Sequence, residues 1–164
     1  MTATDRLSFL MIVKGASRLG RDTDNRLTEP ENAMSTPPLP LVYSCSGCSN
    51  VAQLANTLAV RLDRAGLAEM SCIAGVGGRV SSLVNKANSG RSILAIDGCP
   101  LHCARACLAQ HDVIADVHIT LSSYGLRKRY REDCSESEAD ALFEDMCSII
   151  ASDRMKPRPR LYSV

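Results

Sequence analysis

The segment Ser92-Ile93-Leu94-Ala95-Ile96-Asp97-Gly98-Cys99-Pro100 contains an uninterrupted apolar run that ends in a polar turn. Apolar residues at every position from Ile93 to Ile96 are typical of a parallel strand that is covered on both faces. In parallel α/β sheets, ligands bind beyond the carboxyl ends of the strands. The segment therefore predicts a buried strand whose following turn, with Asp97 and Cys99, lies at a functional edge.

Strand and helix signals alternate on both sides of this segment. Short apolar runs predict further strands at 39–43, 70–74 and 117–121. Helical periodicity separates them at 50–65, 80–89 and 99–110, and a last helix follows at 135–150. This alternation predicts an α/β fold: a single three-layer domain with a mostly parallel sheet, in which every strand-to-helix turn lies at the carboxyl edge.

Local signals also place the helix ends. Asn50 is expected to cap the first helix with Gln53 at the capping-box position, and Gly66 to stop it. Ser135 and Glu138 form a second capping-box pattern.

The domain is predicted to span residues 39–152. Residues 1–38 contain polar, aperiodic sequence and several prolines, and we expect a disordered extension there. Met34 lies just before the ordered pattern, so a start of translation at that position is an alternative. Residues 153–164 are expected to form a flexible tail.

The composition argues against two classes of partner. Lys and Arg number 19 against 18 Asp and Glu, which gives no basic surplus for binding nucleic acid or an anionic membrane. Trp is absent and aromatic residues make up only 4%, so a platform for stacking bases is not expected. No feature of the sequence indicates a particular protein partner.

The eight cysteines are unusual and require the compartment to be settled first. The apolar run Ser8–Val13 is shorter than a signal-peptide core and far shorter than a membrane span. We therefore expect a cytoplasmic protein. In that reducing environment, clustered thiols more often bind metal or perform redox chemistry than form stable disulfides.

Five of the cysteines follow the predicted strands. Cys45 and Cys48 lie in the turn after the first strand, Cys72 ends the second, and Cys99 and Cys103 open the helix after the third. The topology brings all five to one edge of the sheet. Zinc takes about four soft ligands in a tetrahedron, so we predict a zinc site there.

Pro100 suits the first position of a helix, which predicts Cys99 as the cap residue with a stabilised thiolate. Four-residue spacing would then place Cys99 and Cys103 on one helical face. We expect Cys107 to be a small buried hydrophobe, and Cys134 and Cys147 to be structural or surface thiols.

Three motifs together resemble the DGC-domain family, which is named for Asp-Gly-Cys and described as zinc-binding. They are Cys45-Ser46-Gly47-Cys48-Ser49-Asn50, the segment 70–78, and Ala95-Ile96-Asp97-Gly98-Cys99-Pro100-Leu101. The resemblance spans roughly residues 41–150 and implies no established activity.

The resemblance also implies a ligand set of Cys45, Cys72, Cys99 and Cys103, with Cys48 as a fifth candidate. Spacing alone favours Cys48 over Cys72, and the choice between them stays open.

Two other chemistries remain open for the same thiols. One is a thiol-redox or sulfur-handling enzyme with Cys99 as nucleophile. The other is an iron–sulfur carrier. No Ser/His/Asp arrangement and no pair of carboxylates with supporting motif context indicates hydrolysis.

Among the neighbouring residues, Asp97 is expected either to orient a ligand or to bond the N–H groups of its own turn. The glycines at 75, 77 and 78 predict a tight turn beside the metal. The three histidines are expected to pack or to be partly exposed rather than to bind metal: His102, His111 and His118.

Overall fold

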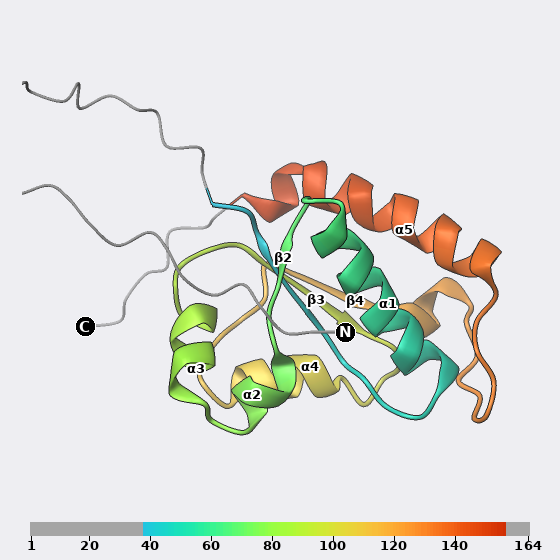
Figure 1. The fold of residues 1–164 in the computed structure, drawn as a ribbon, viewed down its shortest axis with the longest axis horizontal. Coiled ribbons are helices and arrows are strands. Elements are labelled where there is room, and N and C mark those ends of the chain that lie inside the picture. Colours follow the sequence, from blue (N-terminus) through green and yellow to red (C-terminus); the bar gives the residue numbers. More distant parts are fainter. Residues whose placement is uncertain (1–37, 157–164) are drawn as a thin grey trace, which may run out of the picture. The chain divides into compact units, whose positions relative to one another are not determined.

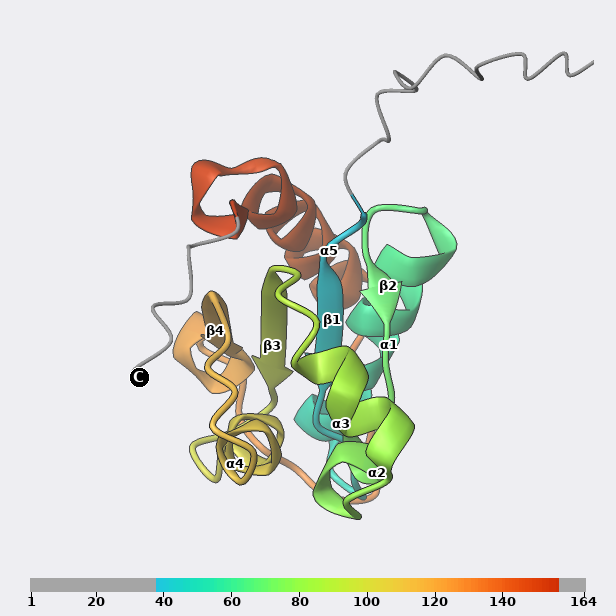
Figure 2. The same cartoon turned by 90° about the vertical axis from the view of Figure 1, so that its left-hand side faces the viewer.

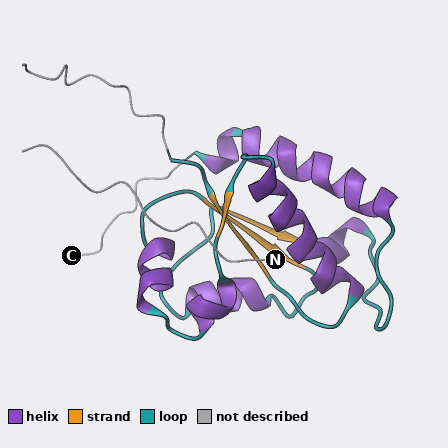
Figure 3. Ribbon diagram, viewed as in Figure 1, coloured by secondary structure: helices purple, strands orange, loops and turns teal. Residues whose placement is uncertain are grey.

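The computed structural model describes residues 38–156, in which strands and helices alternate (Figure 3). The elements are β1 (Leu41–Ser44), α1 (Asn50–Arg64), β2 (Glu69–Met70), α2 (Ile73–Gly77), α3 (Ser81–Ala87), β3 (Ile93–Asp97), α4 (Cys103–Ala109), β4 (Val117–Thr120) and α5 (Glu136–Ala151), with 3-10 turns η1 (Leu121–Tyr124) and η2 (Asp153–Met155).

The strands form one parallel sheet in the order β2-β1-β3-β4 (Figure 2). The pairing of β1 with β3 runs from Leu41 opposite Ile93 to Ser44 opposite Ile96. The four residues from Ile93 to Ile96 are fully buried, as their apolar run predicts for an inner strand. The predicted α/β class and parallel sheet are confirmed.

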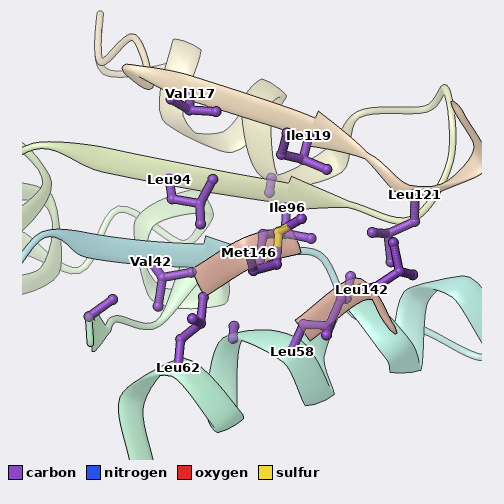
Figure 4. Close-up of a cluster of buried hydrophobic side chains, with 14 of the residues drawn as sticks. Val42, Leu58, Leu62, Leu94, Ile96, Val117, Ile119, Leu121, Leu142 and Met146 are labelled. Atoms are coloured by element: carbon purple, nitrogen blue, oxygen red, sulfur yellow. The ribbon is translucent and has the colours of Figure 1, made fainter. Parts of the chain in front are cut away.

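Helices cover both faces of the sheet (Figure 1). On one face, α1 and α5 pack on the strands in the larger apolar cluster (Figure 4). Its residues include Val42, Leu94, Ile96, Leu58, Leu62, Leu142 and Met146. Leu58 is fully buried, and burying a leucine side chain stabilises a fold by about 2 kcal/mol.

A second cluster packs on the opposite face of the sheet. Alternate residues of the central strands, including Tyr43 and Ala95, meet Val76 of α2, Ala87 of α3 and Leu108 of α4. The two clusters confirm the three-layer arrangement.

Two local predictions about helix starts have different outcomes. The capping box of α5 is present, because Ser135 accepts from the Glu138 N–H and Glu138 accepts from the Ser135 N–H. Asn50, by contrast, does not cap α1: Ser49 occupies the cap position, without a side-chain bond. The Asn50 amide instead bonds the backbone of Arg127 and Arg129, which takes it away from the helix terminus.

The predicted strand at 70–74 is wrong beyond Met70. Only Glu69–Met70 is a strand, and the chain enters α2 at Ile73. The Cys72 thiol caps this helix by accepting from the Gly75 N–H at 3.4 Å. Gly75 is therefore helical rather than part of a tight turn, and a Cβ there would lie 2.0 Å from Leu83 Cδ1. Packing of α2 against α3 explains the glycine.

The fold continues past the predicted boundary at 152. Met155 in η2 is buried against the larger cluster. Of the predicted terminal segments, residues 1–37 and 157–164 lie outside the described residues. Across 38–156, no helix has the length and apolar character needed to cross a membrane.

Candidate metal centre

The candidate site lies where the connections from β1 and β3 diverge. From β1 the chain passes to α1 on one face, whereas β3 leads to α4 and β2 leads to α2 on the other. Because β1 and β3 are neighbours, their carboxyl ends flank a topological switch point, where α/β sheets bind ligands. Cys45 follows β1 directly, and Gly98-Cys99 follows β3.

Cys45 is the buried thiol of this switch point. Its side chain is only slightly exposed, and its backbone N–H donates to the Ile96 carbonyl at 2.9 Å. Its Sγ accepts the Gly98 N–H at 3.1 Å. Burial raises the pKa of Cys45 to about 11, against the lowering effect of the Gly98 N–H, and the negative charges of Asp97, Cys103 and Cys99 contribute to the rise.

Gly98 fits the site because it has no side chain. A Cβ at this position would lie 2.5 Å from the Val51 carbonyl oxygen and 2.9 Å from the Ala52 nitrogen, in the first turn of α1. The Gly98 carbonyl also accepts the Ser122 N–H at 3.2 Å. Close packing of β3 against α1 thus requires the glycine and presents its N–H to Cys45.

Asp97 is fully buried and holds the first turn of α4. Its Oδ1 accepts the Ala104 N–H at 2.8 Å, and its Oδ2 accepts the Arg105 N–H at 3.2 Å. These are the N–H groups that a helix cap normally bonds. Asp97 was expected either to orient a ligand or to bond N–H groups of its own turn. The structure shows bonds to N–H groups, but these belong to the first turn of α4.

The start of α4 differs from the prediction. The helix begins at Cys103, so Pro100 is not its first residue and Cys99 is not its cap. The segment 98–102 instead forms a turn that ends at His102, whose φ of 50° and ψ of 47° are left-handed. The carboxylate of Asp97 bonds two N–H groups of the helix at once, so the helix starts at Cys103 and not at Pro100. Cys99 and Cys103 therefore do not share a helical face.

Two histidines belong to this network, and their roles were not predicted from the sequence. His118 Nε2 donates to Asp97 Oδ2 at 2.9 Å, since a carboxylate only accepts. The His102 ring packs edge-to-face on His118 at 4.8 Å and bonds Thr120 and Arg105. A polar residue on the covered face of a strand, between the buried Val117 and Ile119, was the available signal for His118.

The other predicted ligands differ in exposure. Cys48, Cys72 and Cys103 are exposed, whereas Cys99 is half-buried. Lys128 lies near two of these thiols: its hydrogen bond to the Tyr130 hydroxyl oxygen raises the pKa of Lys128 most, and the charges of Cys99 and Cys48 also raise it.

Three further cysteines are half-buried, and burial raises the pKa of each thiol: Cys107, Cys134 and Cys147. Cys107 packs against α2, where a Cβ at Gly77 would lie 2.9 Å from its Sγ.

A segment distant in sequence bonds Ser49 and Asn50, directly after the Cys45–Cys48 turn. Asn50 Nδ2 donates to the Arg127 carbonyl at 3.1 Å, and Asn50 Oδ1 accepts the Arg129 N–H at 2.7 Å. A third bond joins the Asn50 N–H to the Arg129 carbonyl, and Ser49 forms an antiparallel bridge with Tyr130. Asn50 thereby fixes the segment 127–130, hereafter the basic loop, beside Cys48.

The candidate thiols do not form a metal site as they stand in the described residues. Among residues 38–156, no three His, Cys, Asp or Glu side chains are close enough to share a metal ion. Asp97 in particular is occupied at both carboxylate oxygens by the bonds described above. The donor types suit zinc, but the thiols would have to move closer together to bind it.

The family of the chain follows from its sequence relatives. The DGC domain family matches residues 41–146, and the chain belongs to that family. It is also 68% identical over 109 residues to the Anaerobic and virulence modulator AnvM of Pseudomonas aeruginosa; this match covers 66% of the present chain and 83% of AnvM. No solved structure matches the chain.

Proposed function

We propose that this protein is a zinc-binding module that holds one ion through cysteine thiolates at the switch point. Cys45, Cys99 and Cys103 are the proposed core of the ligand set, with a fourth thiolate from Cys48 or Cys72. Four thiolates would close the coordination shell, as in structural zinc sites.

The environment of Cys45 carries the proposal. The thiol of Cys45 is buried, and its sulfur accepts an N–H hydrogen bond. The charges of Cys99 and Cys103 also raise its pKa. A thiol with a raised pKa is a poor ligand until a cation stabilises its thiolate. A zinc ion between the turns would supply that stabilisation, and the Gly98 N–H would orient the sulfur.

The choice of the fourth ligand rests on what each thiol contacts. Cys72 Sγ already accepts the Gly75 N–H as the cap of α2. Cys48 is exposed and lies three residues after the buried Cys45, in the same turn after β1. We therefore favour Cys48 and retain Cys72 as the alternative.

Zinc binding requires the turns to draw together, since no three donors are within reach of one ion among the described residues. Metal loading should consequently order the segments that carry Cys48 and Cys99. The binding free energy would then appear partly as added stability of the fold.

The proposed setting is the reducing cytoplasm, where eight free cysteines are chemically reasonable. The printed name of the relative AnvM describes a modulator. We propose a similar, non-catalytic role for the present chain, in which the metal is structural, sensed or transferred.

A thiol-redox enzyme is the second candidate, favoured by the half-buried Cys99 in the turn after β3 and by the exposed thiols Cys48 and Cys103, which could resolve a disulfide. The Cys99 thiolate would attack a substrate disulfide and release one thiolate. A second thiol, Cys48 or Cys103, would then displace the other half as a thiolate and leave a disulfide with Cys99.

Metal content distinguishes these functions. Untagged protein purified without oxygen is analysed for zinc, iron and sulfide, beside serine variants of the five candidate cysteines and a Cys134→Ser control. About one zinc per chain, lost in four of the five variants and kept in the control, supports the proposal. Iron with sulfide would indicate a cluster protein. A metal-free protein with rapid alkylation of Cys99 would favour the redox enzyme.

A further inference from the structure

Asp97, His118 and His102 form a connected polar network behind the turn that carries Cys99 and Cys103. The carboxylate of Asp97 is fully buried, and each of its oxygens accepts at least one N–H. Its third bond comes from His118 Nε2 on the neighbouring strand β4. Asp97 itself is therefore unavailable as a metal ligand in this arrangement.

The turn in front of this network is strained. His102 adopts the left-handed conformation without being glycine, at the cap position of α4. A non-glycine residue in this conformation costs about 1–2 kcal/mol and persists only where its surroundings hold it. Three contacts hold the His102 ring: Thr120, Arg105 and the edge-to-face packing with His118.

The geometry fixes the position of Cys103 from both sides. Cys103 is the first residue of α4, between the strained His102 and the two N–H groups that Asp97 accepts. Releasing Asp97 would free the first turn of α4, and releasing His118 would loosen both the carboxylate and the His102 ring. The backbone that carries Cys103 thus depends directly on Asp97 and, through Asp97 and His102, on His118.

We propose that Asp97 and His118 are positioning residues that set the orientation of Cys103, and through His102 that of the Cys99 turn, for metal binding. The inference rests on the proposed zinc function. It gives the Asp of the Asp-Gly-Cys motif the task of holding a ligand-bearing helix in place. Groups that orient metal ligands typically change metal affinity 10–100-fold when they are replaced.

The test compares Asp97→Asn and His118→Gln with a His111→Gln control. The asparagine side chain would keep one accepting oxygen but cannot accept at its nitrogen, so either the Ala104 N–H, or both the Arg105 N–H and His118 Nε2, would lose an acceptor. His111 is a suitable control because its ring bonds the Val76 carbonyl at 2.9 Å, outside the network. Each protein is titrated with Co²⁺ in competition with a chelator, and the visible bands of the bound ion are recorded.

We expect 10–100-fold weaker Co²⁺ binding and altered bands for Asp97→Asn and His118→Gln, and unchanged values for His111→Gln. A variant with a lower melting temperature but wild-type affinity and bands, measured well below that temperature, would reduce the network to a structural role and overturn the inference.

A metal-free measurement separates this inference from the zinc proposal. Hydrogen exchange of the Ala104 amide, the Arg105 amide or both should accelerate at least ~10-fold in metal-free Asp97→Asn but not in His111→Gln. If the wild type binds neither Co²⁺ nor Zn²⁺, the zinc function fails, and the claim that these residues orient a metal ligand fails with it. If the wild type binds metal while both variants bind it equally well, only the inference fails.

Discussion

Replacing Gly98 with alanine tests how closely the strand β3 and the helix α1 are packed at the site. The added Cβ would lie 2.5 Å from the Val51 carbonyl oxygen, where ordinary contact needs at least ~3.4 Å, and both groups belong to backbone. No flexible side chain can yield, so β3 or the first turn of α1 must shift by several tenths of an ångström. Such overpacking costs about 1–3 kcal/mol.

The shift also affects two hydrogen bonds of Gly98, to Cys45 Sγ and from the Ser122 N–H. Losing one of them adds about 1 kcal/mol, so we expect Gly98→Ala to lower the free energy of unfolding by about 2–4 kcal/mol. That is a large share of the stability of a typical domain, about 5–15 kcal/mol. Metal affinity should fall as well, because Cys45 Sγ loses its oriented N–H.

Gly90→Ala is the matched control. Gly90 has a φ of +83°, and no atom of the described chain lies within 4 Å of the place that a Cβ would occupy, so the added methyl group meets no obstruction. Only the left-handed backbone is penalised there, by about 1–2 kcal/mol. Urea unfolding followed by far-ultraviolet circular dichroism gives both values, since the chain lacks Trp for fluorescence. A loss at Gly98 no greater than that at Gly90 would refute the packing argument.

Three further outcomes are expected. Burial raises the pKa of Cys45 from 9.0 to about 11, so its thiol in metal-free protein should resist alkylation at pH 8, and fast alkylation there would contradict the argument. The neutral buried thiol stabilises the fold below pH 9, and this contribution of about 2–3 kcal/mol should be lost as the pH rises from about 9 to 11. Ser135→Ala removes the capping box of α5 and should cost about 1 kcal/mol in urea unfolding, against little change for Ser137→Ala. Ion pairs with Lys86 and Arg91 lower the pKa of Glu69 from its ordinary value of 4.5. The stability that these ion pairs give the fold should therefore decrease as the pH falls below that value. Because Glu69 is partly exposed, Glu69→Gln should lower the free energy of unfolding by no more than about 1 kcal/mol at pH 7.

The features that the sequence predicted correctly depend on local pattern or on general topology. The apolar run at Ile93–Ile96 predicted a fully covered strand, because an inner parallel strand has no wet face. The Ser135 capping box needed only residues three positions apart. The predicted parallel sheet placed the turns with Cys45 and Cys99 at the carboxyl ends of their strands, and the structure adds that these two strands are neighbours.

The features that the sequence could not predict depend on contacts distant along the chain. Asp97 captures the N–H groups of α4 seven and eight residues ahead, which overrides the signal of Pro100 for a helix start. His118 reaches Asp97 only because β4 pairs with β3. The short strand β2 gave way to α2 because helix–helix packing decided a segment whose local pattern suited either structure.

The basic loop has a consequence for the order in which the protein folds. Asn50 bonds residues 77 and 79 positions later in the chain. Closing so long a segment lowers the chain entropy before the new contacts can stabilise it, so such contacts tend to form late in folding. The sheet and α1 should therefore assemble first, and the loop should dock on a nearly finished domain. A newly made chain would then present the Asn50 side-chain amide, two residues after Cys48, to solvent until this last step.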